Sequence, residues 1–107
     1  MKVYGFREQE TGIMEIGEEL EVYREFVGGG LEAYCMGKGL YIILNKDGRL
    51  EELEPRVAHV DEGLTRQIIT GDCFVCRFDE NGLSASIKEE DITYISEKLI
   101  AIRNYIG

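Results

Sequence analysis

With 107 residues, 44% of them hydrophobic and 31% charged, the chain has the size and composition of one soluble globular domain, spanning residues 1–107. Its formal net charge is −9 and it contains no basic stripe, which argues against direct binding to nucleic acid. An odd count of three cysteines favours a reducing cytoplasm over a disulfide framework, and the lack of an apolar run in residues 1–30 argues against a signal peptide or a membrane span.

The beginning of the chain predicts a hairpin followed by a short helix. β-favouring side chains indicate strands at residues 1–6 and 13–16, with a polar turn between them. Residues 18–27 are predicted to be helical because four apolar side chains fall on one face of a 3.6-residue period: Leu20, Tyr23, Phe26 and Val27. Gly28 follows directly, where a left-handed residue is expected to end the helix.

The middle of the chain predicts further strands. Residues 31–36 alternate between two faces, and residues 40–44 are apolar on both faces, which is typical of a central strand. A turn is predicted at residues 45–48, followed by a polar edge strand at residues 49–53 that Pro55 ends.

Residues 56–70 are harder to assign, with a short strand at 57–60 and a loop or helical turn at 61–66. Residues 72–78 are predicted to be a strand, and one face of it is assigned to the core: Phe74, Cys76 and Phe78. A tight turn at residues 79–82 follows.

The last part of the chain predicts a long helix, at about residues 87–105. Ser86 and Glu89 have the spacing of a capping box. Apolar residues then recur at intervals of three and four: Ile92, Ile95, Leu99, Ile102 and Ile106. The predicted fold class is therefore α+β, with a mainly antiparallel sheet of five or six strands covered on one face by the helices at about 18–27 and 87–105.

Several short motifs, taken together, resemble a known family. They are Val-Gly-Gly at 27–29, Glu32 in the next strand, Leu-Asn-Lys-Asp-Gly-Arg-Leu at 44–50, Leu53, Pro55, and Ile-Thr-Gly-Asp at 69–72. Over residues 18–95 this pattern resembles a small bacterial domain family of unknown function that occurs in phages, plasmids and conjugative elements. Arg56 departs from the pattern, because the family often has asparagine after the proline. The resemblance implies a mobile-element setting and brings no catalytic residue.

Four glycines are assigned to structural turns: Gly28, Gly29, Gly48 and Gly82. The glycine run at 28–30 is not a phosphate loop, because it follows a helix instead of opening one. The turns at 45–48 and 79–82 have glycine at their fourth position, whereas a calcium loop needs it at the sixth.

No cofactor, metal or catalytic residue is predicted. Cys73 and Cys76 lie three positions apart in a predicted strand, so their side chains point to opposite faces and cannot converge on zinc together with Cys35 and His59. His59 is the only histidine, and no nucleophile is placed beside it by a recognisable motif.

A candidate interface is predicted on the final helix. Four residues fall beside its core stripe at i, i+4, i+7 and i+11: Tyr94, Lys98, Ala101 and Tyr105. The two tyrosines either widen the core or form a surface for self-association or for an unidentified protein partner.

Two hypotheses for the function are favoured, and a third, a small hydrolase or nucleotide enzyme, is disfavoured because the sequence lacks suitable ligands. The first is a non-enzymatic cytoplasmic accessory protein of a mobile element that acts through protein contacts. The alternative is an acidic mimic of DNA that inhibits a DNA-binding enzyme, as an antirestriction protein does. The net charge of −9 suits either hypothesis, and it also keeps a small protein soluble.

Overall fold

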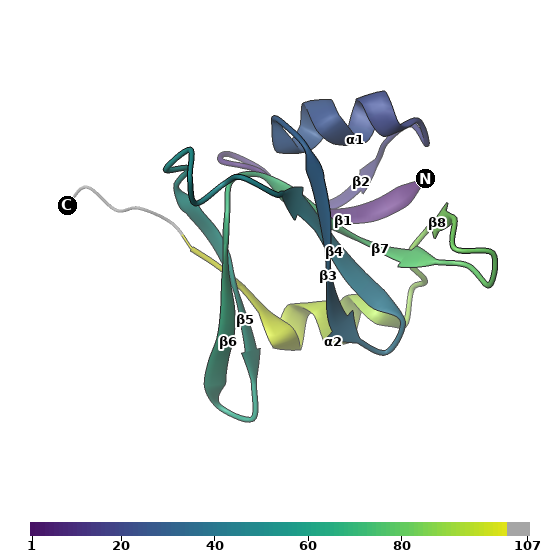
Figure 1. Cartoon of the computed structure of the whole chain (residues 1–107). Helices are drawn as coiled ribbons and strands as arrows, with labels where there is room; N and C mark the ends of the chain where they lie inside the picture. The colour runs from purple at the N-terminus through teal and green to yellow at the C-terminus, as the bar shows by residue number, and fades with distance from the viewer. Residues whose placement is uncertain (103–107) are drawn as a thin grey trace.

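A computed structural model describes residues 1–102 and contains two antiparallel sheets and two short helices (Figure 1). The larger sheet has six strands: β1 (Lys2–Phe6), β2 (Thr11–Glu15), β3 (Leu31–Gly37), β4 (Leu40–Asn45), β7 (Cys73–Phe78) and β8 (Ser84–Ala85). Its order is β2-β1-β7-β4-β3, and β8 pairs with the end of β7. The smaller sheet has the order β6-β5-β9: β5 (Pro55–Asp61), β6 (Leu64–Thr70) and β9 (Leu99–Ala101). The helices are α1 (Leu20–Val27) and α2 (Asp91–Lys98).

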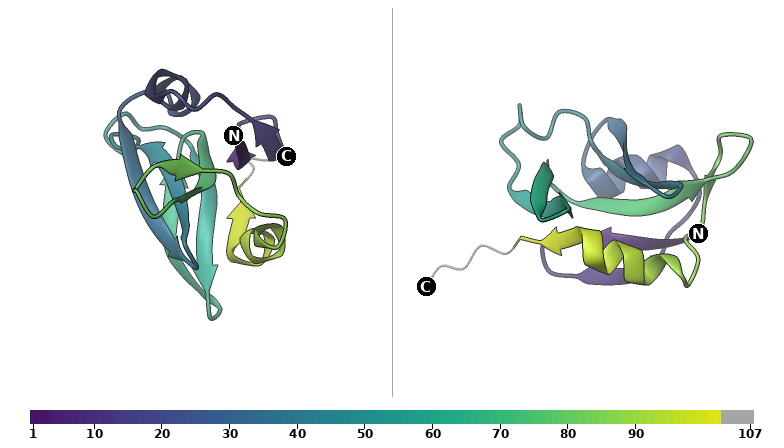
Figure 2. Two further views of the ribbon diagram at one scale, coloured as in Figure 1. Left: turned by 90° about the vertical axis from the view of Figure 1, so that its right-hand side faces the viewer. Right: turned by 90° about the horizontal axis from the view of Figure 1, so that it is seen from below.

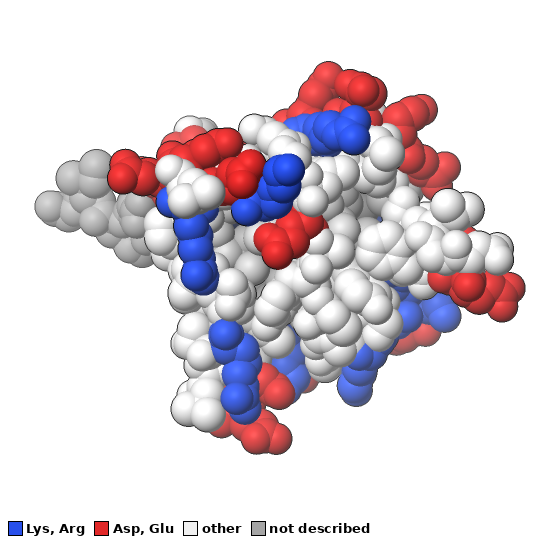
Figure 3. Space-filling model, viewed as in Figure 1, with Lys and Arg blue, Asp and Glu red and all other residues white. Residues whose placement is uncertain are grey.

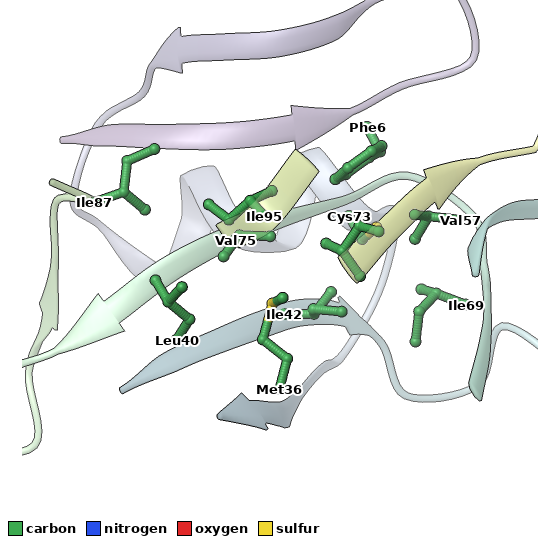
Figure 4. Close-up of a cluster of buried hydrophobic side chains, with 11 residues drawn as sticks. Phe6, Met36, Leu40, Ile42, Val57, Ile69, Cys73, Val75, Ile87 and Ile95 are labelled. Atoms are coloured by element: carbon green, nitrogen blue, oxygen red, sulfur yellow. The ribbon is translucent and has the colours of Figure 1, made fainter. Parts of the chain in front are cut away.

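The large sheet forms the middle layer of the molecule. Helix α1 lies on one side of it, whereas α2 lies on the other, next to the smaller sheet (Figures 1 and 2). The prediction of a single sheet with both helices on one face is therefore wrong. The core therefore has two parts. The part under α1 contains Val3, Tyr23, Phe26, Val27, Ile43, Phe74 and Cys76. The part between the two sheets and α2 includes Phe6, Leu40, Ile42, Val57, Ile69, Cys73, Val75 and Ile95 (Figure 4).

Strand β7 runs through the middle of the large sheet, with β1 on one side and β4 on the other. The predicted strand is confirmed, but the assignment of only one of its faces to the core is incomplete. Phe74 and Cys76 pack toward α1, while Cys73 and Val75 pack toward α2, and all four are fully buried. A strand flanked on both sides and covered on both faces requires such a continuous apolar run.

The predicted long helix at about 87–105 is wrong. Helix α2 has eight residues, and after Lys98 the chain becomes strand β9, which pairs with β5 from Val57 to His59. The apolar spacing of Ile95 and Leu99 fits a helix, but residues 99–102 are also a good strand sequence. The open edge of β5 decides between them, because pairing there satisfies the backbone and buries Leu99.

The predicted capping box at Ser86 and Glu89 is not formed. The hydroxyl of Ser86 instead accepts a hydrogen bond from the backbone N–H of Lys2, at 2.9 Å. Helix α2 starts after Glu90, which makes no side-chain cap, and the carboxylate of Asp91 accepts the N–H of Lys88 at 2.7 Å. Residues 87–90 therefore precede the helix.

The segment between β4 and β7 also differs from the prediction. Residues 49–52 form turns and residue 53 has no regular structure, so the predicted edge strand is absent, and Pro55 is the first residue of β5 and not the end of a strand. Residues 55–70 form a complete hairpin, β5–β6, where the sequence predicted one short strand and a loop or helical turn. Glu62 and Gly63 make its tight turn with positive φ angles of 51° and 76°.

The four glycines assigned to turns occupy two kinds of position. Gly28 ends α1 in the left-handed region, with φ of 78°, and Gly82 has φ of 79° in the turn between β7 and β8. Gly29 and Gly48 lie outside that region, and a Cβ atom there would come within 2.8 Å and 2.5 Å of side chains on neighbouring strands.

We expect Gly28→Ala to lower the free energy of unfolding by about 1 kcal/mol, because a Cβ is disfavoured at positive φ. No atom lies within 4 Å of that Cβ, so the loss reports backbone conformation alone. The matched control is Gly30→Ala, whose φ is not positive and whose Cβ would come closest to the flexible side chain of Lys46. Urea denaturation measures both, and equal losses would contradict a requirement for glycine at the end of α1.

Candidate protein-binding groove

The polar residues of greatest chemical interest meet where β3, β5 and α2 come together. The hydroxyl of Tyr34 lies 2.6 Å from Nδ1 of His59, and burial lowers the pKa of this histidine and raises the pKa of this tyrosine. Close by, Nζ of Lys98 donates to Asp61 at 2.6 Å, and the Tyr94 hydroxyl donates to the carbonyl of Met36 at 2.9 Å. These contacts join α2 to both sheets.

The candidate interface residues are therefore not aligned on one helix. Tyr94 and Lys98 share a face of α2, and the Lys98 ammonium lies 5.9 Å from the centre of the Tyr94 ring. Ala101 belongs to β9 and pairs with Val57, and Tyr105 lies outside the described residues. The hydroxyl of Tyr94 and the ammonium of Lys98 are already engaged within the chain, which argues against an interface at these two residues.

Cys73 and Cys76 do not face a common site. Cys73 and Cys76 are buried on opposite faces of β7, as their spacing predicted, and Cys35 is exposed. Burial raises the pKa of Cys76 to about 12 and that of Cys73 further still, so both stay as thiols. Within residues 1–102, no three His, Cys, Asp or Glu side chains are placed to hold a metal ion.

An apolar groove lies on the α1 side of the large sheet and has a volume of about 430 Å³. Ala33 and Ile43 form part of its lining from the sheet, and Leu20 and Tyr23 form a wall from α1. Phe78, Leu83 and Ser84 contribute the opposite wall from the β7–β8 hairpin. Leu20 is 57% exposed and Leu83 is 65% exposed, so each wall presents a leucine to solvent.

Three local features shape this groove. Helix α1 has only eight residues, about 12 Å in length, and so it is too short to cover the whole face of the sheet. The β7–β8 turn is fixed by the Asp79 side chain, which accepts the N–H groups of Asn81 and Leu83 at 2.8 and 2.9 Å. The hydroxyls of Tyr23 and Ser84, 2.7 Å apart, then hold the helix and the hairpin together.

The groove carries little charge, although the chain is strongly acidic. In the space-filling view an uncharged area occupies much of the middle of the face that carries β3, and charged side chains of both signs lie around it (Figure 3). Glu18 and Glu32 are the charged residues that line the groove, and both are exposed. An apolar centre with a charged rim is the usual composition of a protein-binding surface.

A second, polar pocket of about 510 Å³ lies near the end of α1. Its carboxylates are Glu8, Glu25, Glu52, Glu54 and Asp72, and Arg56 lies among them at 3.1 Å from Asp72. A mimic of DNA needs carboxylates in a row along one elongated face. On the face shown in Figure 3 the acidic side chains instead form separate groups with lysine and arginine among them.

The family model described as domain of unknown function DUF3846 matches residues 1–100. The chain belongs to this family. The match includes both helices and every strand, apart from the last residue of β9. The groove and its walls are therefore built from residues of the family domain. No curated protein and no solved structure matches the chain.

Neither helix in residues 1–102 is long and apolar enough to cross a membrane. The groove itself was not predicted from the sequence, where Leu20 was only placed on the apolar face of the first helix. One signal for it was present, because Leu83 is a large apolar residue directly after the turn at 79–82 and had no predicted partner. The distance between the helix and the hairpin depends on the tertiary fold and leaves no local pattern.

Proposed function

We propose that this chain is a non-enzymatic accessory protein that binds a protein partner through the groove between α1 and the β7–β8 hairpin. The observation that carries the proposal is the pair of exposed leucines, Leu20 and Leu83, on facing walls of an apolar groove. Large apolar side chains grouped around a concavity with a polar rim mark interaction sites on soluble proteins.

Binding is better supported than catalysis by the chemistry of the groove. Its lining offers two glutamates, a tyrosine and a serine, and the hydroxyls of Tyr23 and Ser84 already bond to each other. His59 is not among the lining residues and is paired with Tyr34. Covalent catalysis requires a general base next to a nucleophile, and the groove is not lined by such a pair.

The setting belongs to the same proposal. We infer a cytoplasmic protein of a mobile genetic element from the resemblance to a phage and plasmid family, and the three free thiols support a reducing compartment. The partner is expected to offer an apolar surface, because burial of the two leucines is the main favourable term that the groove supplies.

Affinity capture from the host with Leu83→Ser tests the proposal against wild type. Loss of a leucine that becomes buried on binding should weaken the complex at least tenfold, because it removes about 1.5–3 kcal/mol. The matched control is Leu64→Ser, since Leu64 is 58% exposed but begins β6 and does not line the groove. Equal recovery of the same partner by wild type and both variants would contradict binding through the groove.

A further inference from the structure

Strand β3 is an edge of the large sheet and pairs only with β4 among residues 1–102. Gly30 lies opposite Lys46, whose N–H donates to the Gly30 carbonyl at 3.0 Å. Because hydrogen-bonded and non-bonded pairs alternate in an antiparallel ladder, Glu32 and Tyr34 turn their backbone groups toward β4. Three residues then direct theirs to the open edge: Leu31, Ala33 and Cys35.

The same three residues carry their side chains on the α1 side of the sheet. Leu31 packs with the core under α1, and Leu31 and Ala33 both line the groove. Ala33 and Cys35 are exposed. A strand added beside β3 would lie about 4.8 Å away and would place alternate side chains next to the open side of the groove.

This edge lacks most of the usual protection against strand addition. Natural edge strands are blocked by proline, lysine, bulges or a covering segment. Residues 31–35 contain no proline and no lysine, and the irregular pairing of β3 with β4 starts only after Cys35. Strand β6, an edge of the small sheet, carries the basic residue Arg66 in its middle, whereas the one charged residue of β3 is the acidic Glu32.

The charge on β3 indicates which kind of partner fits this edge. Glu32 is the one charged residue of β3 and borders the groove, but its side chain alternates with those of Leu31 and Ala33 and is therefore directed to the other face of the sheet. Tyr34 and Met36 share that face and belong to the core there. A second copy of the chain, with its own charge of −9, would bring carboxylates against this acidic surface. A segment with lysine or arginine opposite Glu32 would instead form a favourable cross-strand pair.

We propose that the partner binds as an extended segment that pairs with the open edge of β3, with apolar side chains toward the groove and basic side chains toward Glu32. The proposal rests on the proposed function and adds the form and charge of the ligand. It predicts a ligand sequence that alternates between apolar and basic residues, because successive side chains of a strand point to opposite faces.

The probe is a short synthetic peptide of alternating valine and lysine, followed by amide NMR spectra of the protein. We expect shifts and slowed hydrogen exchange at the amides of Leu31, Ala33 and Cys35, whose N–H groups become bonded. A peptide with the same composition in two blocks, valines then lysines, controls for charge alone. A valine–glutamate peptide controls for the sign of the charge. Neither control should bind at the edge.

Two changes test the backbone pairing itself. Methylation of alternate peptide nitrogens removes the donors of the added strand and leaves the protein unaltered. Ala33→Pro removes an outward N–H while keeping the ladder with β4, and loss of one hydrogen bond should weaken binding about fivefold. If Ala33→Pro fails to fold, the comparison of the methylated with the unmethylated peptide still tests strand addition.

The outcomes separate this inference from the proposed function. If Leu83→Ser weakens peptide binding but methylation of the peptide nitrogens does not, strand addition is overturned and the groove remains the binding site. Binding of the block peptide as tightly as the alternating peptide would overturn the pairing as well. A dimer in sedimentation that Ala33→Pro dissociates would replace the basic segment by a second copy of the chain.

Discussion

Phe74→Ala should lower the free energy of unfolding by about 3–5 kcal/mol, the usual cost of truncating a large aromatic side chain in a core. Phe74 is fully buried and is the second residue of β7, between β1 and β4. Its ring contacts those of Tyr23 and Phe26, with centroids 5.3 and 5.0 Å away. The change therefore leaves a cavity beneath α1 and removes two aromatic contacts that hold the helix on the sheet.

The matched control is Phe78→Ala in the same strand and on the same face. Phe78 is only partly buried and pairs with Tyr41 at 4.9 Å, so its truncation should cost clearly less. Urea denaturation followed by circular dichroism measures both variants. A loss at Phe74 below about 1 kcal/mol, or no larger than the loss at Phe78, would contradict its place at the centre of the α1 core.

The central strands could be predicted because their local pattern and their tertiary setting agree. Residues 40–44 are apolar on both faces, and β4 does lie between β3 and β7 with Ile42 and Ile43 buried on opposite sides. The first hairpin was equally clear, and β1 pairs with β2 from Lys2 to Phe6. In both places a single period of side chains fits a single structure.

The end of the chain could not be predicted, because its pattern fits two structures. Leu99 continues the helical spacing from Ile95, yet it also begins a run of β-favouring residues. The deciding factor is the free edge of β5, and this strand was itself only partly recognised. Because residues 56–70 were only partly assigned, the prediction lacked the β5 edge with which residues 99–101 pair. These residues were therefore predicted to continue the helix instead of forming β9.

The groove depends on a similar tertiary factor. The apolar stripe of α1 was predicted, and Tyr23, Phe26 and Val27 are buried as expected. Leu20 lies in the first turn of α1 and remains exposed, because the sheet face near it is partly covered by the β7–β8 hairpin and partly open. A pattern of apolar residues shows which side of a helix turns inward, but not how far the covered surface extends.

Asp91→Ala should lower the free energy of unfolding by about 3 kcal/mol, because it leaves the Arg77 guanidinium without its partner inside the protein. The Asp91 side chain is 5% exposed and that of Arg77 is 23% exposed. Arg77 donates from Nε and Nη2 to the two carboxylate oxygens at 2.6 and 2.5 Å. This bidentate pair fixes the start of α2 against β7, near the point where the sequence predicted a different helix start.

The control for this prediction is Glu21→Ala, which removes an exposed ion pair. Glu21 lies 3.7 Å from Arg24 on α1, and its side chain is 84% exposed. Pairs of this kind contribute little, so a change within about 0.5 kcal/mol is expected. Similar losses for Asp91→Ala and Glu21→Ala would show that the buried pair is not important for stability.

The pH dependence of stability gives a second, independent measurement of the same pair. The hydrogen bonds from Arg77 lower the pKa of Asp91 below its ordinary value, so the folded chain binds fewer protons at this site than the unfolded chain. The stabilisation is therefore complete at neutral pH and is lost as the pH falls below about 4, the range of an unfolded aspartate. Asp91→Asn cannot titrate, so the stability difference between wild type and this variant should shrink from pH 7 to pH 3. A difference that stays constant over that range would show that ionisation of Asp91 does not stabilise the fold.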